Sequence, residues 1–427
     1  NKRAGELRER AQSQSGSRIA GRCTGNCNEE NLKAKVKAQT QSQAKGQTTP
    51  KGFTKEERQM TKIKGTDAKK SLEDFGERIS KEIESKKNPK FVTTARTRSN
   101  IIFNEKKGYL SLGPAQEERS FLNTAQSKKF MQSIAIAAKC HKFVKENLHT
   151  SIRGLYYQLK YSLGEDVDEN IFNEQSESNP LIEDLEVALD LKREDLNLNA
   201  NRKGLLAGNM RIIDNFGKER QEIDASKMGR SGWAIPSDVD NDIEFVDVKA
   251  KYVLIVEKQA LWQRLNEDGI WKKENMILMS PEGQASRGAR RLIRKLADMG
   301  LPVYVLNDAD AWGWYIYWTI KTGSINLAYI GSTIATPEAK FLGVTISDIE
   351  KYDFLKSLTL KATEVDLKRA QEMLSYPWIN KHKEWADELK KVLTMKTKIE
   401  SDALQGPRLT FVQDYIKEKI KNKDFLP

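Results

Sequence analysis

Two apolar segments that each end in acidic residues decide the fold. Residues 251–258 read KYVLIVEK, and residues 302–313 read PVYVLNDADAWG. Short, continuous apolar runs of this kind are typical of strands that are buried on both faces of a parallel sheet. The expected strands span residues 252–256, 276–279 and 302–306, and the expected helices span 259–265, 287–299 and 311–321. This alternation predicts an α/β domain with a parallel sheet.

Three acidic residues follow these strands: Glu257 after the first, and Asp308 and Asp310 after the last. The functional crevice of an open parallel sheet lies at the carboxyl ends of its strands. Three carboxylates at that edge would repel one another unless a cation lies between them, and an all-oxygen ligand set favours Mg²⁺. The alternative is that they are ordinary loop acids. We favour a magnesium site because all three fall at one edge of one sheet.

The same sheet carries no recognisable phosphate-binding loop. No GxGxxG follows a strand, and no GxxxxGK(S/T) occurs anywhere in the chain. The motifs therefore favour neither a dinucleotide-binding site nor a P-loop ATPase.

Upstream of this domain, residues 118–240 are expected to form a helical unit with a small β-wing. Helices are predicted at 125–148, from 152 onward and at 180–191, followed by a strand pair at 205–214 around Gly208. The second helix carries an apolar stripe of Ile152, Tyr156, Leu159 and Leu163. Helices that are followed by a β-wing are typical of winged helix-turn-helix domains, which bind DNA.

Two adjacent tyrosines on the second helix face different ways. Residues 150–157 read TSIRGLYY, and one residue of an α-helix rotates a side chain by about 100°. Tyr156 therefore falls on the apolar stripe, whereas Tyr157 shares a face with Arg153 and Tyr161. A guanidinium favours the phenolate form of a tyrosine and can also bind a phosphate. Tyr157 is thus a candidate nucleophile for a phosphodiester, and the alternative is an exposed tyrosine–arginine contact without function.

The charge distribution favours a polyanionic partner, with nucleic acid first. The chain has 427 residues, 72 Lys+Arg, 60 Asp+Glu and a formal net charge of +12. Residues 1–100 contain 24 basic and 12 acidic residues, which leaves 48 of each in the remainder, so the whole surplus lies in the first quarter. Residues 1–60 are predicted to be a disordered basic extension, and residues 61–117 an arm that leads into the helical unit.

Apolar runs and cysteine usage favour an intracellular protein. No apolar run is long enough to span a membrane, and no secretory signal is expected. Cys23, Cys27 and Cys140 form neither a disulfide framework nor a complete zinc site, which fits a reducing compartment.

Several separated motifs together resemble the A subunits of type IIB topoisomerases, the topoisomerase VI family, to which the meiotic double-strand-break protein is related. The resemblance covers roughly residues 85–427. The matching stretches are residues 151–157 (SIRGLYY), 173–179 (NEQSESN), 182–186 (IEDLE), 227–236 (KMGRSGWAIP), 253–258 (VLIVEK), 307–313 (NDADAWG), 323–324 (GS) and 398–404 (KIESDAL). Each stretch is weak alone, whereas the ordered set is highly specific.

The resemblance implies two domains with separate chemical roles. A winged-helix, CAP-like domain at 118–240 would carry Tyr157 as the nucleophile, with Arg153 at the scissile phosphate. A Rossmann-like Toprim domain at 245–427, with a helical C-terminal part, would bind magnesium. Its implied ligands are Glu257, Asp308 and Asp310.

The resemblance also implies an assembly. Two A subunits would each cut one strand of double-stranded DNA and leave 5′-phosphotyrosyl ends. A separate B subunit would bind and hydrolyse ATP and drive strand passage in an A2B2 heterotetramer. The expected protein is therefore the DNA-cleaving subunit of an ATP-dependent DNA topoisomerase, located inside the cell and associated with DNA.

Two departures from the family pattern leave details open. Ala311 stands where the family usually has proline, which predicts slightly looser positioning without loss of the metal. The Gly-x-Pro before the family's arginine helix is altered at residues 283–291, so the individual roles of its arginines are open. Arg287, Arg290 and Arg291 are expected to contact DNA phosphates.

Two other functions stay open from the motifs alone. One is a meiotic-type protein that forms double-strand breaks without strand passage. The other is a non-catalytic, DNA-binding scaffold with a degenerate Toprim domain, which Ala311 slightly favours and the intact acidic residues and Tyr157 disfavour.

Overall fold

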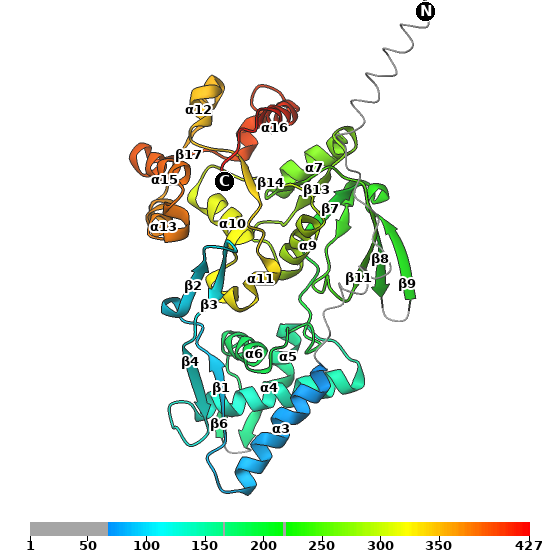
Figure 1. The fold of residues 1–427 in the computed structure, drawn as a ribbon, viewed down its shortest axis with the longest axis vertical. Coiled ribbons are helices and arrows are strands. Elements are labelled where there is room, and N and C mark those ends of the chain that lie inside the picture. Colours follow the sequence, from blue (N-terminus) through cyan, green and yellow to red (C-terminus); the bar gives the residue numbers. More distant parts are fainter. Residues whose placement is uncertain (1–66, 165–166, 217–218) are drawn as a thin grey trace, which may run out of the picture. The chain divides into compact units, whose positions relative to one another are not determined.

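A six-stranded sheet forms the core of the C-terminal half of the protein in the computed structural model (Figure 1). Its strand order is β10-β7-β13-β12-β14-β15. The strands span Trp233–Ala234 (β10), Leu205–Gly208 (β7), Ile277–Ser280 (β13), Val253–Val256 (β12), Val303–Leu306 (β14) and Lys340–Gly343 (β15). β12 runs parallel to β13 and β14, and β14 runs parallel to β15. β7 runs antiparallel to both β13 and β10, so the sheet is mixed. The three predicted strands, their parallel pairing and the α/β class are confirmed.

The structure describes residues 67–164, 167–216 and 219–427. The predicted basic extension at 1–60 lies outside these residues, as do the first part of the arm and both Cys23 and Cys27. Cys140 is buried and free. No described helix combines the length and apolar character needed to cross a membrane.

Three predicted helices pack around the sheet (Figure 1). They are Gln259–Glu267 (α7), Arg287–Asp298 (α9) and Ala311–Thr322 (α10). α10 begins where the sequence predicts, because the side chain of Asp310 accepts a hydrogen bond from the amide of Gly313 and caps the helix. Ala311 therefore occupies the first helical position, and the helix forms without the family's proline. Two fully buried aromatic side chains of α10, Trp314 and Tyr317, pack against the fully buried Trp385.

The predicted strand pair around Gly208 is wrong, because its two strands belong to different sheets. β7 pairs with β13 in the six-stranded sheet. β8 (Met210–Phe216) pairs instead with β9 (Glu219–Asp224) and β11 (Ile243–Val248). The chain passes between the sheets at Gly208, where φ is +141° and a Cβ would lie 2.5 Å from the carbonyl oxygen of Met276. The expected β-wing is therefore not this pair, and the winged-helix assignment stays a prediction.

Four helices of the N-terminal half share a separate apolar core (Figure 1). They are Ala68–Glu84 (α3), Ser127–Glu146 (α4), Ile152–Leu159 (α5) and Gln175–Leu189 (α6). α5 is shorter than the predicted stripe, because the chain enters a hairpin of Ser162–Gly164 (β5) and Val167–Asn170 (β6). Leu163 is thus in a strand. Tyr161 lies beyond the helix, and the prediction that it shares a helical face with Tyr157 is wrong.

Short strands and helices complete the described fold. In the arm, Lys90–Thr94 (β1) pairs with Gln116–Ser120 (β4), and Ile101–Asn104 (β2) pairs with Tyr109–Leu112 (β3). The other α-helices are Ile270–Lys273 (α8), Gly331–Ile334 (α11), Asp348–Lys351 (α12), Glu364–Leu374 (α13), Pro377–Asn380 (α14), Lys383–Met395 (α15) and Phe411–Asn422 (α16). Leu360–Lys361 (β16) pairs with Thr397–Lys398 (β17). After β17, a β-bridge between Ile399 and Ala309 brings the following residues to the end of β14.

Candidate active site

The helix α5 presents Tyr157 at the surface. Ser151 caps the helix, because its hydroxyl accepts a hydrogen bond from the amide of Gly154 at 2.9 Å. Tyr156 is buried, and its hydroxyl donates a hydrogen bond to the carbonyl of Asn173 at 2.8 Å. Tyr157 is 58% exposed. The predicted division between a core tyrosine and an accessible one is confirmed.

Arg153 contacts the accessible phenol. Its Nη2 donates a hydrogen bond to the hydroxyl of Tyr157 at 3.4 Å, and its guanidinium carbon lies 5.8 Å from the centre of the ring. The hydrogen bond from Arg153 and then its positive charge lower the pKa of Tyr157 below the ordinary tyrosine value, and Lys160 adds to the effect. A lowered pKa makes the phenolate more accessible, as a nucleophilic tyrosine requires.

The three predicted acidic residues meet at the carboxyl ends of two adjacent strands. β12 and β14 are in register, with Val256 opposite Leu306, so Glu257 emerges beside Asp308 and Asp310. Burial, followed by the charges of Asp308 and Asp310, raises the pKa of Glu257 to about 7. Burial also raises the pKa of Asp310. The structure therefore brings together the three carboxylates that the strand pattern places at this edge.

Hydrogen bonds orient two of these acids. Asp308 Oδ1 accepts from the amide of Ser401 at 2.7 Å and from its hydroxyl at 2.6 Å. Asp310 accepts from the amide of Gly313 at 2.7 Å. Contacts of this kind fix the direction in which a carboxylate presents its remaining lone pairs.

Sequence reasoning missed a group of residues beside the acids. Lys258 lies 3.3 Å from Asp308, 3.1 Å from Glu400 and 2.8 Å from Asp402. The stretches 253–258 and 398–404 both carry the family resemblance, but their residue types alone do not indicate a role for Lys258 or for the residues around Ser401. Their presence in two separated motifs is the signal that could have found them.

The chemistry of the acidic group fits a hard divalent cation. The set consists of carboxylate oxygens. Burial and then the charges of Asp308 and Asp310 raise the pKa of Glu257, and a bound cation would offset this repulsion. In the described part of the chain, no three His, Cys, Asp or Glu side chains are already arranged to hold a metal ion. Asp308 Oδ1 and Asp310 Oδ1 each accept hydrogen bonds from the protein, and Lys258 pairs with Oδ2 of Asp308.

The three arginines predicted to contact DNA lie on α9 and are mostly engaged within the protein. Arg287 is 9% exposed and binds both carboxylate oxygens of Glu186, at 2.7 and 3.1 Å. Arg291 binds Asp240 at 2.9 Å. Arg290 is 4% exposed, and its Nε has no hydrogen-bond partner among the described residues. Contact between these arginines and DNA stays a prediction.

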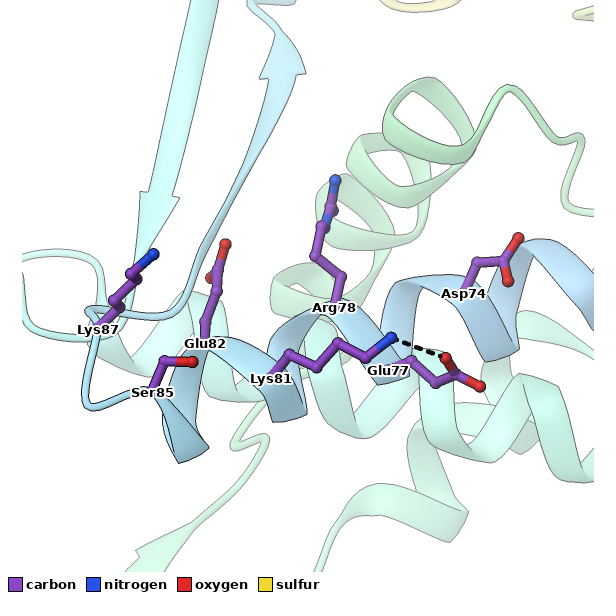
Figure 2. Close-up of a pocket in the computed structure, with 7 residues that line it drawn as sticks. All are labelled: Asp74, Glu77, Arg78, Lys81, Glu82, Ser85 and Lys87. Atoms are coloured by element: carbon purple, nitrogen blue, oxygen red, sulfur yellow. Dashed lines mark hydrogen bonds and ion pairs between the residues drawn. The ribbon is translucent and has the colours of Figure 1, made fainter.

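A separate hollow of about 400 Å³ lies along α3 (Figure 2). Its lining is charged and of both signs, and Lys81 pairs with Glu77 across one helical turn at 3.3 Å (Figure 2). The lining residues are Asp74, Glu77, Arg78, Lys81, Glu82, Ser85 and Lys87. None of them belongs to the tyrosine or the acidic group, so the hollow carries no part of the candidate chemistry.

Three family models match successive parts of the chain. Residues 128–198 match the model described as "Type IIB DNA topoisomerase". Residues 203–249 match "All-beta domain in DNA topoisomerase VI alpha subunit". Residues 252–420 match the model of the Toprim domain that Spo11 shares with the A subunit of topoisomerase 6. The first match contains Tyr157, and the last contains all three acidic residues.

Three relatives that match along most of their length are named as the A subunit of type 2 DNA topoisomerase 6. The protein from Pyrococcus abyssi is 42% identical over 370 residues, which cover 84% of this chain and 95% of that protein. The protein from Pyrococcus horikoshii has the same identity and coverage. The protein from Hyperthermus butylicus is 40% identical over 378 residues, which cover 84% of this chain and 96% of that protein.

Proposed function

The chain belongs to the family of topoisomerase VI A subunits, and on that premise we propose that Tyr157 is the residue through which it cleaves DNA. The observation that carries the proposal is the accessible phenol of Tyr157 with Arg153 beside it. An exposed nucleophile can reach a duplex backbone, and a guanidinium can bind the phosphate that it attacks. The protein is accordingly the DNA-cleaving subunit of a type IIB topoisomerase.

The proposed reaction is a reversible transesterification. The phenol oxygen of Tyr157 forms a bond to phosphorus, and the bond from phosphorus to the 3′ oxygen of the neighbouring nucleotide breaks. The phenolic proton leaves to solvent, and the 3′ oxygen takes up a proton to become a hydroxyl group. The DNA end then carries a 5′-phosphotyrosyl link, and the reverse attack of the hydroxyl group reseals the strand. Arg153 orients the phosphate and neutralises part of its charge.

Glu257, Asp308 and Asp310 are the residues that we propose to hold Mg²⁺. When bound, Mg²⁺ supplies positive charge next to the phosphate oxygens. The protein's own contribution is to keep three carboxylates at one sheet edge, with Ser401 and Gly313 fixing two of them.

One active site is proposed to combine two A subunits. Within the described residues, the hydrogen bonds and ion pairs of Tyr157 and Arg153 do not reach the acidic group. A second copy of the chain could bring its acids to this tyrosine, and the reciprocal contact would then cut the other strand. The A subunits would act on double-stranded DNA with a B subunit that binds ATP, as an A2B2 heterotetramer.

Substitution of Tyr157 tests the proposed nucleophile, and Tyr161 offers a matched control. Tyr161 is 53% exposed and lies four residues further along the chain, beyond the end of α5. With a B subunit, ATP and Mg²⁺ present, Tyr157→Phe should abolish covalent protein–DNA adducts, whereas Tyr161→Phe should retain them. Adducts at the wild-type level in Tyr157→Phe would refute the assignment.

Relaxation of supercoiled DNA separates the proposed function from a break-forming one. The names of the relatives favour the topoisomerase. We expect the A and B subunits together to relax DNA when ATP and Mg²⁺ are present. Breaks without relaxation would instead favour a protein that cuts without strand passage.

A further inference from the structure

Lys258 forms ion pairs with one of the three acidic residues and with two further carboxylates beside them. Its ammonium lies 3.3 Å from Oδ2 of Asp308, which is one of the proposed metal ligands. It also lies 3.1 Å from Glu400 and 2.8 Å from Asp402, which have no part in the proposed reaction. A single cation thus bridges a proposed ligand and a pair of acids outside the ligand set.

The two carboxylate oxygens of Asp308 have different partners: Oδ1 accepts hydrogen bonds from Ser401, and Oδ2 pairs with Lys258. Ser401 is 1% exposed, and its amide and hydroxyl both bind Oδ1 of Asp308. Because two hydrogen bonds hold Oδ1, Oδ2 is the oxygen that Asp308 can offer to a cation. Lys258 is bound to that oxygen.

We infer that Lys258 competes with the metal for Asp308, and that Glu400 and Asp402 hold the ammonium when the metal binds. The inference rests on the proposed metal role of Asp308. Two cations at one carboxylate oxygen repel each other, so the ammonium must leave that oxygen as the metal arrives. The ammonium of Lys258 already contacts Glu400 and Asp402, so it can keep these two ion pairs when it leaves Asp308. Lys258 is therefore a positioning residue that sets how tightly this edge of the sheet binds a divalent cation.

Calorimetric titration of the full chain with Mg²⁺ tests the competition. Removal of the competitor in Lys258→Met should tighten Mg²⁺ binding by up to about fivefold, the upper end of the range expected for a partly exposed ion pair. Asp402→Asn should weaken it, because Lys258 then stays on Asp308. The side chain of Asp402 is 40% exposed, so its substitution buries no unpaired charge. Binding of Mn²⁺ followed by electron paramagnetic resonance gives a second readout that does not depend on DNA cleavage.

A double-variant cycle separates competition from a general effect of charge. In the presence of Lys258→Met, Asp402→Asn should weaken Mg²⁺ binding much less than it does in the wild type. Lys398→Met is the control for charge alone, because Lys398 interacts electrostatically with Asp310 and Glu400. Lys398 pairs with Asp366 at 3.2 Å and, among the described residues, has no ion pair with Asp308. In that background the effect of Asp402→Asn should persist in full.

Two outcomes overturn different claims. An equal effect of Asp402→Asn with and without Lys258 would overturn the competition and leave the metal site standing. A wild-type chain that binds neither Mg²⁺ nor Mn²⁺ would overturn the proposed role of the three acids, and the competition with it.

Discussion

The ion pair between Glu186 and Arg287 joins the helical part of the chain to the Toprim part, and its loss should lower stability strongly. Glu186 lies on α6 and is fully buried, while Arg287 opens α9 and is 9% exposed. Tyr329 also donates a hydrogen bond to Glu186, at 2.7 Å. Glu186→Gln keeps the shape of the side chain and removes the charge, so the buried guanidinium loses its principal partner without a cavity being formed.

The expected loss follows from the geometry. At contacts of 2.7 and 3.1 Å, the attraction amounts to about 6 kcal/mol at an effective dielectric constant of about 20. Glu183 remains 3.6 Å from Arg287 and recovers part of this attraction. We therefore expect Glu186→Gln to lower the free energy of unfolding by about 3 kcal/mol, at the lower end of the range for a broken buried pair.

Tryptophan fluorescence during equilibrium unfolding in urea measures the change in unfolding free energy. It reports on the C-terminal half of the chain, which contains Arg287. All eight tryptophans lie between Trp233 and Trp385, in the C-terminal half, whereas Glu186 lies in the helical unit. Because the pair couples the two cores, the fluorescence transition should shift to lower urea. Glu338→Gln is the control, with an expected loss below about 1 kcal/mol because its ion pair with Arg294 of the same helix is 3.4 Å long and exposed. A shift below about 1 kcal/mol in Glu186→Gln would refute the coupling.

Three further predictions concern the site and the extension. Because Arg153 lowers the pKa of Tyr157 and the phenolate attacks, the single-turnover cleavage rate should rise with pH and level off below the ordinary tyrosine pKa, and Arg153→Ala should move that inflection upward. An unmoved inflection would contradict the role of Arg153. Ser401→Ala should weaken Mg²⁺ binding by about tenfold in calorimetry, with recovery in Ser401→Thr, because Asp308 loses a hydrogen bond that orients it. Deletion of residues 1–50 should reduce the salt dependence of DNA binding, by about 0.9 in log–log slope for each phosphate that the chain no longer neutralises, while the cleavage rate on bound DNA stays unchanged.

The sequence predicts those elements whose cause is local. Apolar runs at 252–256 and 302–306 are typical of buried parallel strands, and the acids that follow such strands are then expected at one edge of the sheet. The partner of β7 is not local, because an apolar run such as LLAG looks the same in a wing as in a central sheet. The end of α5 escapes prediction for a similar reason. No glycine or proline lies between Leu159 and Tyr161, and the helix ends because the chain joins the β5–β6 hairpin.

The same distinction holds for the candidate site. The exposure of Tyr157 and its contact with Arg153 follow from helical spacing and are found as predicted. Ser401 and Asp308 are 93 residues apart, and no spacing rule connects them. Arg287 belongs to a basic helix whose composition favours phosphate contact, yet its partner Glu186 lies 101 residues earlier in the chain. Contacts of this kind are decided by how segments far apart in the sequence pack together.

The chemical identity of the DNA-linked residue can be measured without any substitution. The full chain, a B subunit, ATP and Mg²⁺ would be incubated with duplex DNA, and the trapped adduct digested with nuclease and protease. Mass spectrometry of the remaining peptide should place the nucleotide on Tyr157, since its phenol is the accessible one and Arg153 lowers its pKa. A nucleotide on Tyr156, on Tyr161 or on any other residue would contradict the proposed mechanism.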